Sequence, residues 1–343
     1  MRDPGTQPGR SKQRPYRPTY SVVGALLAAP FLAVAASAQV AQSRVEVKRE
    51  GANVAFFIDG KLFTRYDTTT GPNKPYFYPV NAPGGRPITR HWPVEPDKIA
   101  GETTDHPHHR GLWFAHGAMN GTDFWTEGKG RGRSVHTGYE RIESGPGYGR
   151  MVARTDWIDA GGKKIAEDRR DVRVTARRGG YVMDIEIAVK AVGGLLVWGD
   201  TKEGTFAIRV ADSMRVNPGK GKTGEGRIVT AVGNKDAAAW GKPAAWIDYY
   251  GPVNGQTVGV AIFDHPGNLR HPTTWQVRDY GLFAANPFGL HDFDPANRPG
   301  AGEHVTPENK TTTFRYRVYV HEGDTSAAGV AAAGPQGDKE HAR

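Results

Sequence analysis

Alternation of apolar and polar residues with a period of two dominates this chain from about residue 44 onward, and it restricts the fold more than any other feature. In YVMDIEIAV, residues 181–189, the odd-numbered apolar residues share one face, while Asp184 and Glu186 share the other. Successive side chains of a β-strand point to opposite faces, so the pattern predicts a half-buried strand. FRYRVYV, residues 314–320, alternates in the same way. Helical periodicity is nearly absent.

Turn signals separate these runs. Pairs that readily adopt positive φ angles predict two-residue β-hairpins; they are Asp59-Gly60, Gly161-Gly162, Gly179-Gly180 and Asn254-Gly255. With 45 glycines and 24 prolines among many short strands, the chain is expected to be all-β, a large antiparallel β-sandwich with long loops. It contains no cysteine, so its core must hold it together without disulfides.

The first 38 residues are typical of a secretory signal peptide. A basic start is followed by the apolar run SVVGALLAAPFLAVAASA, which Pro30 interrupts and small residues close. Cleavage after Ala38 fits better than a membrane span, which needs about 20 uninterrupted apolar residues, although an uncleaved anchor is the alternative. No later segment is long and apolar enough to cross a bilayer. We expect a periplasmic or secreted protein with no stable membrane insertion after signal cleavage.

A single β-sandwich domain is expected over residues 39–323. The stretch 69–105 is rich in proline and glycine and cannot be one continuous sheet, so it is expected to be a long loop. Its aromatic residues, Tyr78 and Trp92 among them, favour an ordered loop that lines a cleft. Residues 324–343 lack such anchors and are expected to form a disordered tail.

The net charge of +9 at pH 7 falls to +5 for residues 39–343, a mild excess that can favour acidic ligands or surfaces. The basic residues are neither gathered in blocks nor interleaved with aromatic residues, as they are in nucleic-acid grooves. The expected partner is therefore a small molecule or a glycan, and no nucleic acid.

The densest group of reactive side chains lies in DHPHHRGLWFAHG, residues 105–117, which holds four of the twelve histidines. Pro107 excludes a helix interior, and Arg110-Gly111 leads into an apolar run, so we expect a loop that enters a strand. If the strand begins at His108, that residue shares one face with Arg110 and His116, while His109 lies on the other.

These imidazoles support two interpretations. Neutral imidazole suits zinc or copper, and the ligand set would be His106, His109 and His116. However, their spacing matches no dedicated ligand pattern, and Arg110 would oppose a cation. The alternative is proton transfer, because imidazole titrates near neutral pH, with Arg110 binding an acidic or hydroxyl group. The sequence requires no cofactor, and zinc or copper stays an alternative.

Candidate carboxylate partners are Asp105, Asp123 and Glu203. Glu203 follows Lys202 in WGDTKEGTFAIRV, where the charged pair stands at the mouth of a strand. A surface salt bridge and a catalytic role explain such a pair about equally well.

A third group, residues 263–289, holds two His-Pro pairs followed by aromatic and polar residues. Proline after histidine commonly just ends a strand. Yet aromatic rings beside Arg, Asn and His are suited to stacking on sugars and bonding their hydroxyl groups. The candidate substrate-binding residues are Arg110, Asp123, Trp125, Lys202, His265, Trp275, Arg278 and Asn286.

The segments DHPHHRGLWFAHGAMNGTDFW, DTKEGTFAIRVADSM, GVAIFDHPGNLRHPTTW and RDYGLFAANPFG together resemble a family of exported bacterial proteins labelled "methane oxygenase PmoA", over about residues 45–322. The resemblance implies a large β-sandwich, similar to the galactose mutarotase-like supersandwich, in bacteria that degrade polysaccharides. Methane oxidation is not carried over, because a membrane monooxygenase subunit has several spanning helices. The chain departs from the family pattern at Gln276, where we expect relatives to have histidine. The resemblance marks as site positions, without roles, His106, His109, Arg110, His116, Asp123, Glu203, His265 and Trp275.

The leading hypothesis is a carbohydrate-active hydrolase, lyase or epimerase. Glu203 and one of His106, His109 or His116 would transfer protons, and Trp125 or Trp275 would stack on the sugar ring. The alternatives are a sugar-binding protein without catalysis and a copper or zinc enzyme with histidine ligands.

Overall fold

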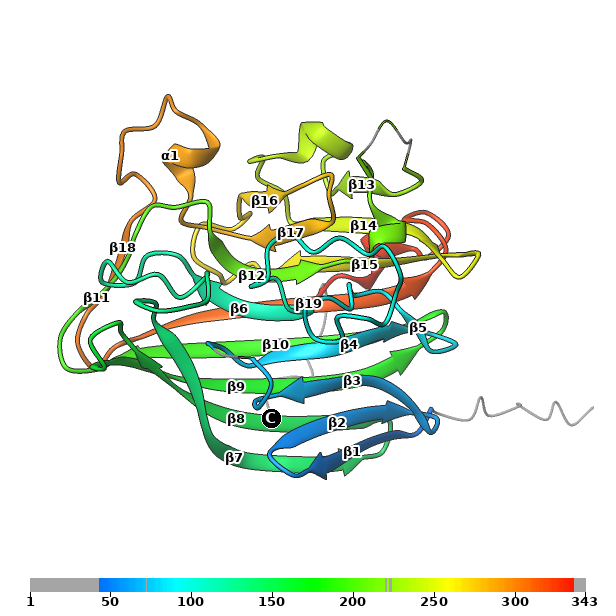
Figure 1. Cartoon of the computed structure of the whole chain (residues 1–343), viewed down its shortest axis with the longest axis horizontal. Helices are drawn as coiled ribbons and strands as arrows, with labels where there is room; N and C mark the ends of the chain where they lie inside the picture. The colour runs from blue at the N-terminus through cyan, green and yellow to red at the C-terminus, as the bar shows by residue number, and fades with distance from the viewer. Residues whose placement is uncertain (1–42, 72, 220, 222–223, 336–343) are drawn as a thin grey trace, which may run out of the picture. The chain divides into compact units, whose positions relative to one another are not determined.

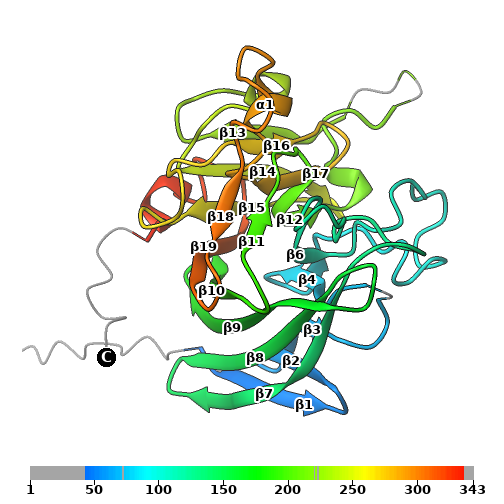
Figure 2. The same cartoon turned by 90° about the vertical axis from the view of Figure 1, so that its left-hand side faces the viewer.

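The alternating segments fold into two antiparallel β-sheets that share one hydrophobic core. The computed structural model describes residues 43–71, 73–219, 221 and 224–335, so the expected signal peptide and residues 336–343 lie outside it. Figures 1 and 2 show the two layers from the front and from the side. The prediction of an all-β, antiparallel sandwich with long loops is confirmed.

The first sheet has the order β1-β2-β3-β4-β6-β12-β17-β16, and β5 pairs with β4. Its strands are β1 (Val45–Glu50), β2 (Asn53–Ile58), β3 (Lys61–Asp67), β4 (Tyr76–Ala82), β5 (Arg86–Pro87), β6 (Leu112–His116), β12 (Gly204–Arg209), β16 (Trp275–Val277) and β17 (Leu282–Ala285).

The second sheet has the order β13-β14-β15-β19-β10-β9-β8-β7. Its strands are β7 (Arg133–Gly145), β8 (Tyr148–Ile158), β9 (Lys164–Arg177), β10 (Gly180–Ala191), β13 (Arg227–Thr230), β14 (Trp246–Val253), β15 (Gln256–Asp264) and β19 (Thr311–Glu322). Outside both sheets, β11 (Leu196–Trp198) pairs with β18 (His304–Thr306). The short helices are η1 (Asp212–Met214), η2 (Asp236–Ala239), α1 (Leu290–Phe293) and η3 (Val330–Ala333).

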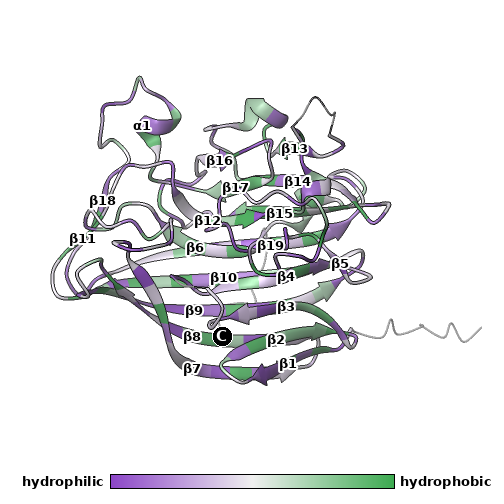
Figure 3. Cartoon of the chain, in the orientation of Figure 1, coloured by the Kyte–Doolittle hydropathy of each residue, from purple (hydrophilic) through white to green (hydrophobic). Residues whose placement is uncertain are grey.

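Period-two alternation sorts the side chains of each strand between the core and the outside, and Figure 3 shows hydrophobic and hydrophilic residues interspersed along the strands. The predicted turns close hairpins: Asp59-Gly60 joins β2 to β3, and Asn254-Gly255 joins β14 to β15. All four turn residues have positive φ angles, between 49° and 78°, as such turns require.

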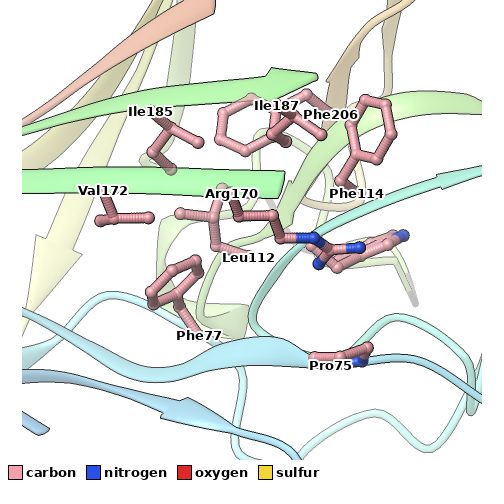
Figure 4. A pocket seen from close by; sticks show the side chains of 10 residues that line it. Pro75, Phe77, Leu112, Phe114, Arg170, Val172, Ile185, Ile187 and Phe206 are labelled. Atoms are coloured by element: carbon pink, nitrogen blue, oxygen red, sulfur yellow. The ribbon is translucent and has the colours of Figure 1, made fainter. Parts of the chain in front are cut away.

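A small space remains between the sheets (Figure 4). It is lined mainly by apolar side chains such as Phe77, Leu112 and Phe206, and Arg170 reaches it from β9. The fully buried charge of Arg170 is compensated, because its Nε and Nη2 both donate to Asp168 at 2.9 Å. This polar pair is therefore a structural part of the core.

Three segments differ from the expectations in detail. The stretch 69–105 contains strand β4, which accommodates Pro79 at an irregularity in its pairing with β3. As expected, a loop leads into strand β6, but the strand begins at Leu112 and not at His108. The residue before it, Gly111, has a positive φ angle, and a Cβ atom there would lie 2.1 Å from the carbonyl oxygen of Phe77.

The third correction concerns the tail. Residues 324–335 are ordered, because η3 places the buried side chains of Val330 and Ala333 against Phe263 and Tyr319 of the second sheet. The hydroxyl of Thr325 also donates to the buried carboxylate of Asp248 at 2.6 Å. Among the described residues, no helix has the length and apolar character needed to cross a membrane.

Candidate functional site

The outer face of the first sheet carries the candidate site. Trp113, Ala207, Ala284 and Gln276 form one row across β6, β12, β17 and β16. The residues next to them in sequence, such as Phe114 and Trp275, face the core instead. Loops fold over this outer row and contribute Trp125 and Tyr280 to a second, smaller aromatic cluster.

Asp105 is the electrostatic centre of this face. Its Oδ1 accepts hydrogen bonds from Arg90 Nη1 and, at 2.8 Å, from Arg209 Nη2, and both arginine side chains are fully buried. Burial alone would raise the pKa of Asp105, but the contact with His106 and the charges of Arg209 and Arg90 hold it well below its usual range. Asp105 therefore stays ionised at all ordinary pH values.

His106 contacts this carboxylate, and its side chain is partly exposed to solvent. Its Nδ1 lies 3.2 Å from Oδ2 of Asp105, although the contact is bent, and 39% of its side chain is exposed. Its ring is stacked between His109, at 4.7 Å, and Tyr280, at 5.1 Å. Its φ of +46° is rare for a residue other than glycine, and such backbone conformations cluster at functional sites.

His109 and His108 both pack against His106, the first with stacked rings and the second edge-on. His109 is buried, stacks on Trp113, and its Nδ1 lies 3.3 Å from Nη1 of Arg209. Burial, with His108 and Arg209 adding to it, lowers the pKa of His109 well below its usual value. Burial also lowers the pKa of His108 to about 4. Both rings are therefore neutral near pH 7.

His116 lies on the opposite face of the sheet. It is fully buried against Trp198 and Phe288, and its Nε2 lies 2.9 Å from the carbonyl oxygen of Gly199. Burial lowers its pKa to about 4. The strand pleat separates His116 from His109, as the alternation predicted, whereas His108, which was expected on the face of His116, packs against His106 and His109 instead.

The suggested metal ligands, His106, His109 and His116, therefore do not converge. The first two rings are nearly parallel, at 7°, so their in-plane nitrogen lone pairs run side by side instead of meeting at one point. Within the described part of the chain, no group of three or more histidine or carboxylate side chains is arranged to hold a metal ion.

Glu203 lies at the other end of the site, where β12 begins. One carboxylate oxygen is 3.2 Å from Nζ of Lys202, and the other accepts a hydrogen bond from Nε2 of Gln276 at 3.3 Å. About a third of its side chain is exposed. Asn286, a predicted substrate-binding residue, is instead buried below this loop and donates to the carbonyl oxygens of Thr201 and Lys202 at 2.9 Å. It positions the loop that carries Glu203.

Tyr280 joins the two ends of the site. Its pKa is raised mainly by burial; Arg209 and Arg278 oppose the rise, and the carboxylates of Glu203 and Asp105 add to it. Both carboxylates therefore act on one half-buried hydroxyl group. Arg278, two residues earlier, is half-buried and stacks its guanidinium 3.5 Å from the ring centre of Trp240.

Other predicted binding residues have different surroundings. Arg110 makes a bidentate ion pair with Glu127, with Nε–O distances of 3.0 and 3.1 Å. Asp123 closes a turn by accepting hydrogen bonds from the backbone of Trp125 and Thr126. His265 lies by Arg315 and Asp184 of the second sheet, away from the groups around Tyr280.

The two tryptophans expected to stack on a sugar are completely buried. Trp275 faces the core and donates from Nε1 to the carbonyl oxygen of Ala244 at 2.8 Å. Trp125 packs against His109 and Trp113 beneath the loops. Because neither ring reaches solvent, their expected exposure was wrong.

Four residues of the site were missed as site residues by the sequence analysis: Arg90, Arg209, Trp240 and Tyr280. Tyr280 stands in the third aromatic and polar group, which was a signal. Arg90 and Arg209 lie 15 and 104 positions from Asp105, and no sequence motif links them to it.

The fold and the site together define an all-β protein with a polar and aromatic surface, built on one outer sheet face, in which a half-exposed histidine stacks on a tyrosine that two carboxylates influence electrostatically. The chain belongs to the Family of unknown function (DUF6807), whose model matches residues 53–334. No curated protein matches the chain.

The chain also resembles solved structures. A galactose mutarotase-like protein from Clostridium acetobutylicum is 10% identical with a TM-score of 0.35, and the match covers 82% of this chain and 99% of that one. A galactose mutarotase related enzyme from Lactobacillus acidophilus is 8% identical with a TM-score of 0.31, over 82% and 98% of the two chains. At these scores the likeness bears on neither substrate nor reaction.

Proposed function

We propose that this protein is an enzyme acting by acid/base chemistry on a carbohydrate or a related polyhydroxy compound, which binds over Tyr280 between His106 and Glu203. One observation carries the proposal: the half-exposed His106 rests on a carboxylate that two fully buried arginines hold in place.

This arrangement resembles the support that catalytic histidines need. A carboxylate beside Nδ1 fixes the tautomer and the ring orientation, so that Nε2 is free to exchange a proton with a bound molecule. Here the stacked rings of His109 and Tyr280 restrict the imidazole further. Because Arg90 and Arg209 neutralise Asp105, that carboxylate is an orienting group and not itself a proton donor.

Glu203 is the second proton-transfer group. Its position between Lys202 and Gln276 leaves one side open to solvent, whereas the neighbouring Asn286 fixes its loop from below. Two such groups on either side of a ring allow one to remove a proton while the other supplies one.

A carbohydrate fits the lining of this surface. Tyr280 and Trp240 are half-buried aromatic residues beside charged and amide side chains, a combination that packs on the apolar face of a sugar ring and bonds its hydroxyl groups. Tyr280 and Trp240 are partly exposed, and they replace Trp125 and Trp275 as the aromatic residues proposed to contact the sugar.

The test compares H106Q, E203Q and Y280F with two matched controls. H265Q changes a histidine beside the second sheet, and E186Q changes a glutamate that pairs with Arg315 on its outer face. Each protein is incubated with a panel of neutral and acidic mono- and oligosaccharides, and products and exchanged protons are followed by NMR and mass spectrometry.

We expect H106Q and E203Q each to lower turnover by about 100- to 10,000-fold, the usual range for a lost acid/base group, and the controls to keep full activity. Equal activity of H106Q, E203Q and H265Q would refute the proposed roles. Binding of a sugar that is never converted by the wild-type protein would instead show a binding protein without catalysis.

A further inference from the structure

We infer that Arg278, stacked on Trp240, is a carboxylate-binding group, and that the natural ligand of this surface is an acidic sugar of the uronate type. The inference rests on the proposed function, which it makes more specific by naming the substrate class.

The other cations around the site are already bound to carboxylates of the protein. Arg90 and Arg209 share Asp105, and Lys202 pairs with Glu203. Glu127 likewise holds Arg110 and, at 3.2 Å, Lys74. None of these cations is free to accept a second anion without giving up its first.

Arg278 differs from all of them. Among the residues that the structure describes, none forms an ion pair or a hydrogen bond with its guanidinium, and its one close partner is the face of Trp240. Its neighbour in sequence, Asp279, is instead held by the side-chain amide of Asn217 at 3.1 Å. The five N–H donors of Arg278 are therefore available to an incoming ligand.

The platform under Arg278 is preorganised. The backbone N–H of Arg278 donates to Leu282 at 2.8 Å in the hairpin between β16 and β17. The segment of Trp240 is tied to the same edge, since Gly241 donates to the carbonyl oxygen of Trp275 at 2.9 Å. Phe293 braces the Trp240 ring edge-on at 5.3 Å. A stacked guanidinium keeps its edge free, and it loses less freedom on binding than a mobile side chain does.

Arg278 is also linked to the site through Gln276 and Tyr280. It comes directly after β16, two residues beyond Gln276, and Gln276 is bonded to Glu203. Its charge acts on the hydroxyl of Tyr280. A ligand carboxylate held by Arg278 would thus place the rest of its ring over Tyr280, within the site already described.

The ligand class follows from this chemistry. The planar fork of arginine matches the two oxygens of a carboxylate, and charge-assisted pairs of this kind are roughly twice as strong as neutral hydrogen bonds. A sugar that carries a carboxylate would contact both the guanidinium of Arg278 and the ring of Tyr280, whereas a neutral sugar would contact the ring of Tyr280 alone.

The experiment measures binding with matched pairs of probes: D-glucuronate against D-glucose, and D-galacturonate against D-galactose. Dissociation constants are determined by NMR titration for the wild-type protein, R278Q, R278K and E203Q. The control is R173Q, which removes an arginine stacked 3.8 Å over Tyr148 on the second sheet.

We expect the wild-type protein to bind at least one uronate about ten-fold more tightly than its neutral partner. R278Q should abolish this preference without weakening neutral binding, R278K should retain part of it, and R173Q should behave as wild type. E203Q should keep or increase the preference, because it removes a nearby negative charge.

Equal binding of acidic and neutral sugars by the wild-type protein, or an unchanged preference in R278Q, would overturn the inference. Turnover of neutral sugars that depends on His106 and Glu203 would in that case leave the proposed function standing. Conversely, uronate binding that depends on Arg278, without conversion of any sugar, would support this inference and contradict the proposed catalysis.

Discussion

The charge of Asp105 should be worth a measurable part of the stability, and D105N tests this. The substitution keeps one acceptor oxygen but leaves the guanidinium groups of Arg90 and Arg209, both with fully buried side chains, without a counter-ion. Losing one partner of a buried ion pair costs about 3–5 kcal/mol. Because 39% of the Asp105 side chain is exposed, and Arg90 keeps bonds to backbone carbonyl groups, we expect about 2–4 kcal/mol.

Thermal unfolding at pH 7 measures the effect. For a domain of this size, about 2 °C is lost per kcal/mol, so D105N should unfold roughly 4–8 °C below wild type. E140Q is the matched control, because Glu140 also serves two arginines, Arg154 and Arg169, but on the exposed face of the second sheet. It should change the stability by less than about 1 kcal/mol.

The pH dependence of the stability gives a second test of the D105N substitution. The pKa of Asp105 in the folded protein is lowered from its ordinary value of 3.8, so its stabilising contribution is complete above that value and declines as the pH falls further. Wild type should therefore lose more stability in acid than D105N does. An unfolding temperature of D105N within 1 °C of wild type, or equal losses in D105N and E140Q, would refute this account of the site.

Two further predictions concern residues that the sequence analysis placed in the site. Because burial lowers the pKa of His116 from 6.5 to about 4, the unfolded chain takes up a proton before the folded one; stability should fall by up to about 3 kcal/mol between pH 6.5 and 4. Urea unfolding across this range should show a flatter profile in H116N, and an identical slope would contradict the assignment. W275A, which empties a fully buried position, should cost about 3–5 kcal/mol. W275F should cost less and leave sugar affinity unchanged in the titrations above; a selective loss of affinity would restore Trp275 to the site.

Much of the fold could be predicted from the sequence, because strand alternation and hairpin turns are local. The segment 181–189 became part of β10, and Asn254-Gly255 closed its hairpin, as their patterns indicated. The two elements that were missed, β4 and η3, also have a local explanation. Strand β4 was hidden by Pro79 and by the glycines around it, and the short apolar contacts of η3 have no periodic signal.

The candidate site was predicted only in part. His106 and Glu203 stood out because imidazole and carboxylate groups in loops beside strands suggest chemistry. Trp275 and Asn286 looked equally suitable, yet one faces the core and the other ties down a loop. Residue type does not reveal on which side of a sheet a side chain will lie when the strand has only three or four residues.

The sequence by itself determined the class of this protein: a cysteine-free chain of alternating strands, with three of its twelve histidines just before β6 and a fourth within it. Only the tertiary structure decided which of them belong together. The pairing of β6, β12, β17 and β16 brings Asp105, Arg209, Glu203 and Tyr280 to one face, and the pleat of β6 turns His116 away from it. The physical reason is that burial and ion pairing depend on contacts between residues far apart in the sequence, 104 positions in the case of Asp105 and Arg209, and no local pattern records such contacts.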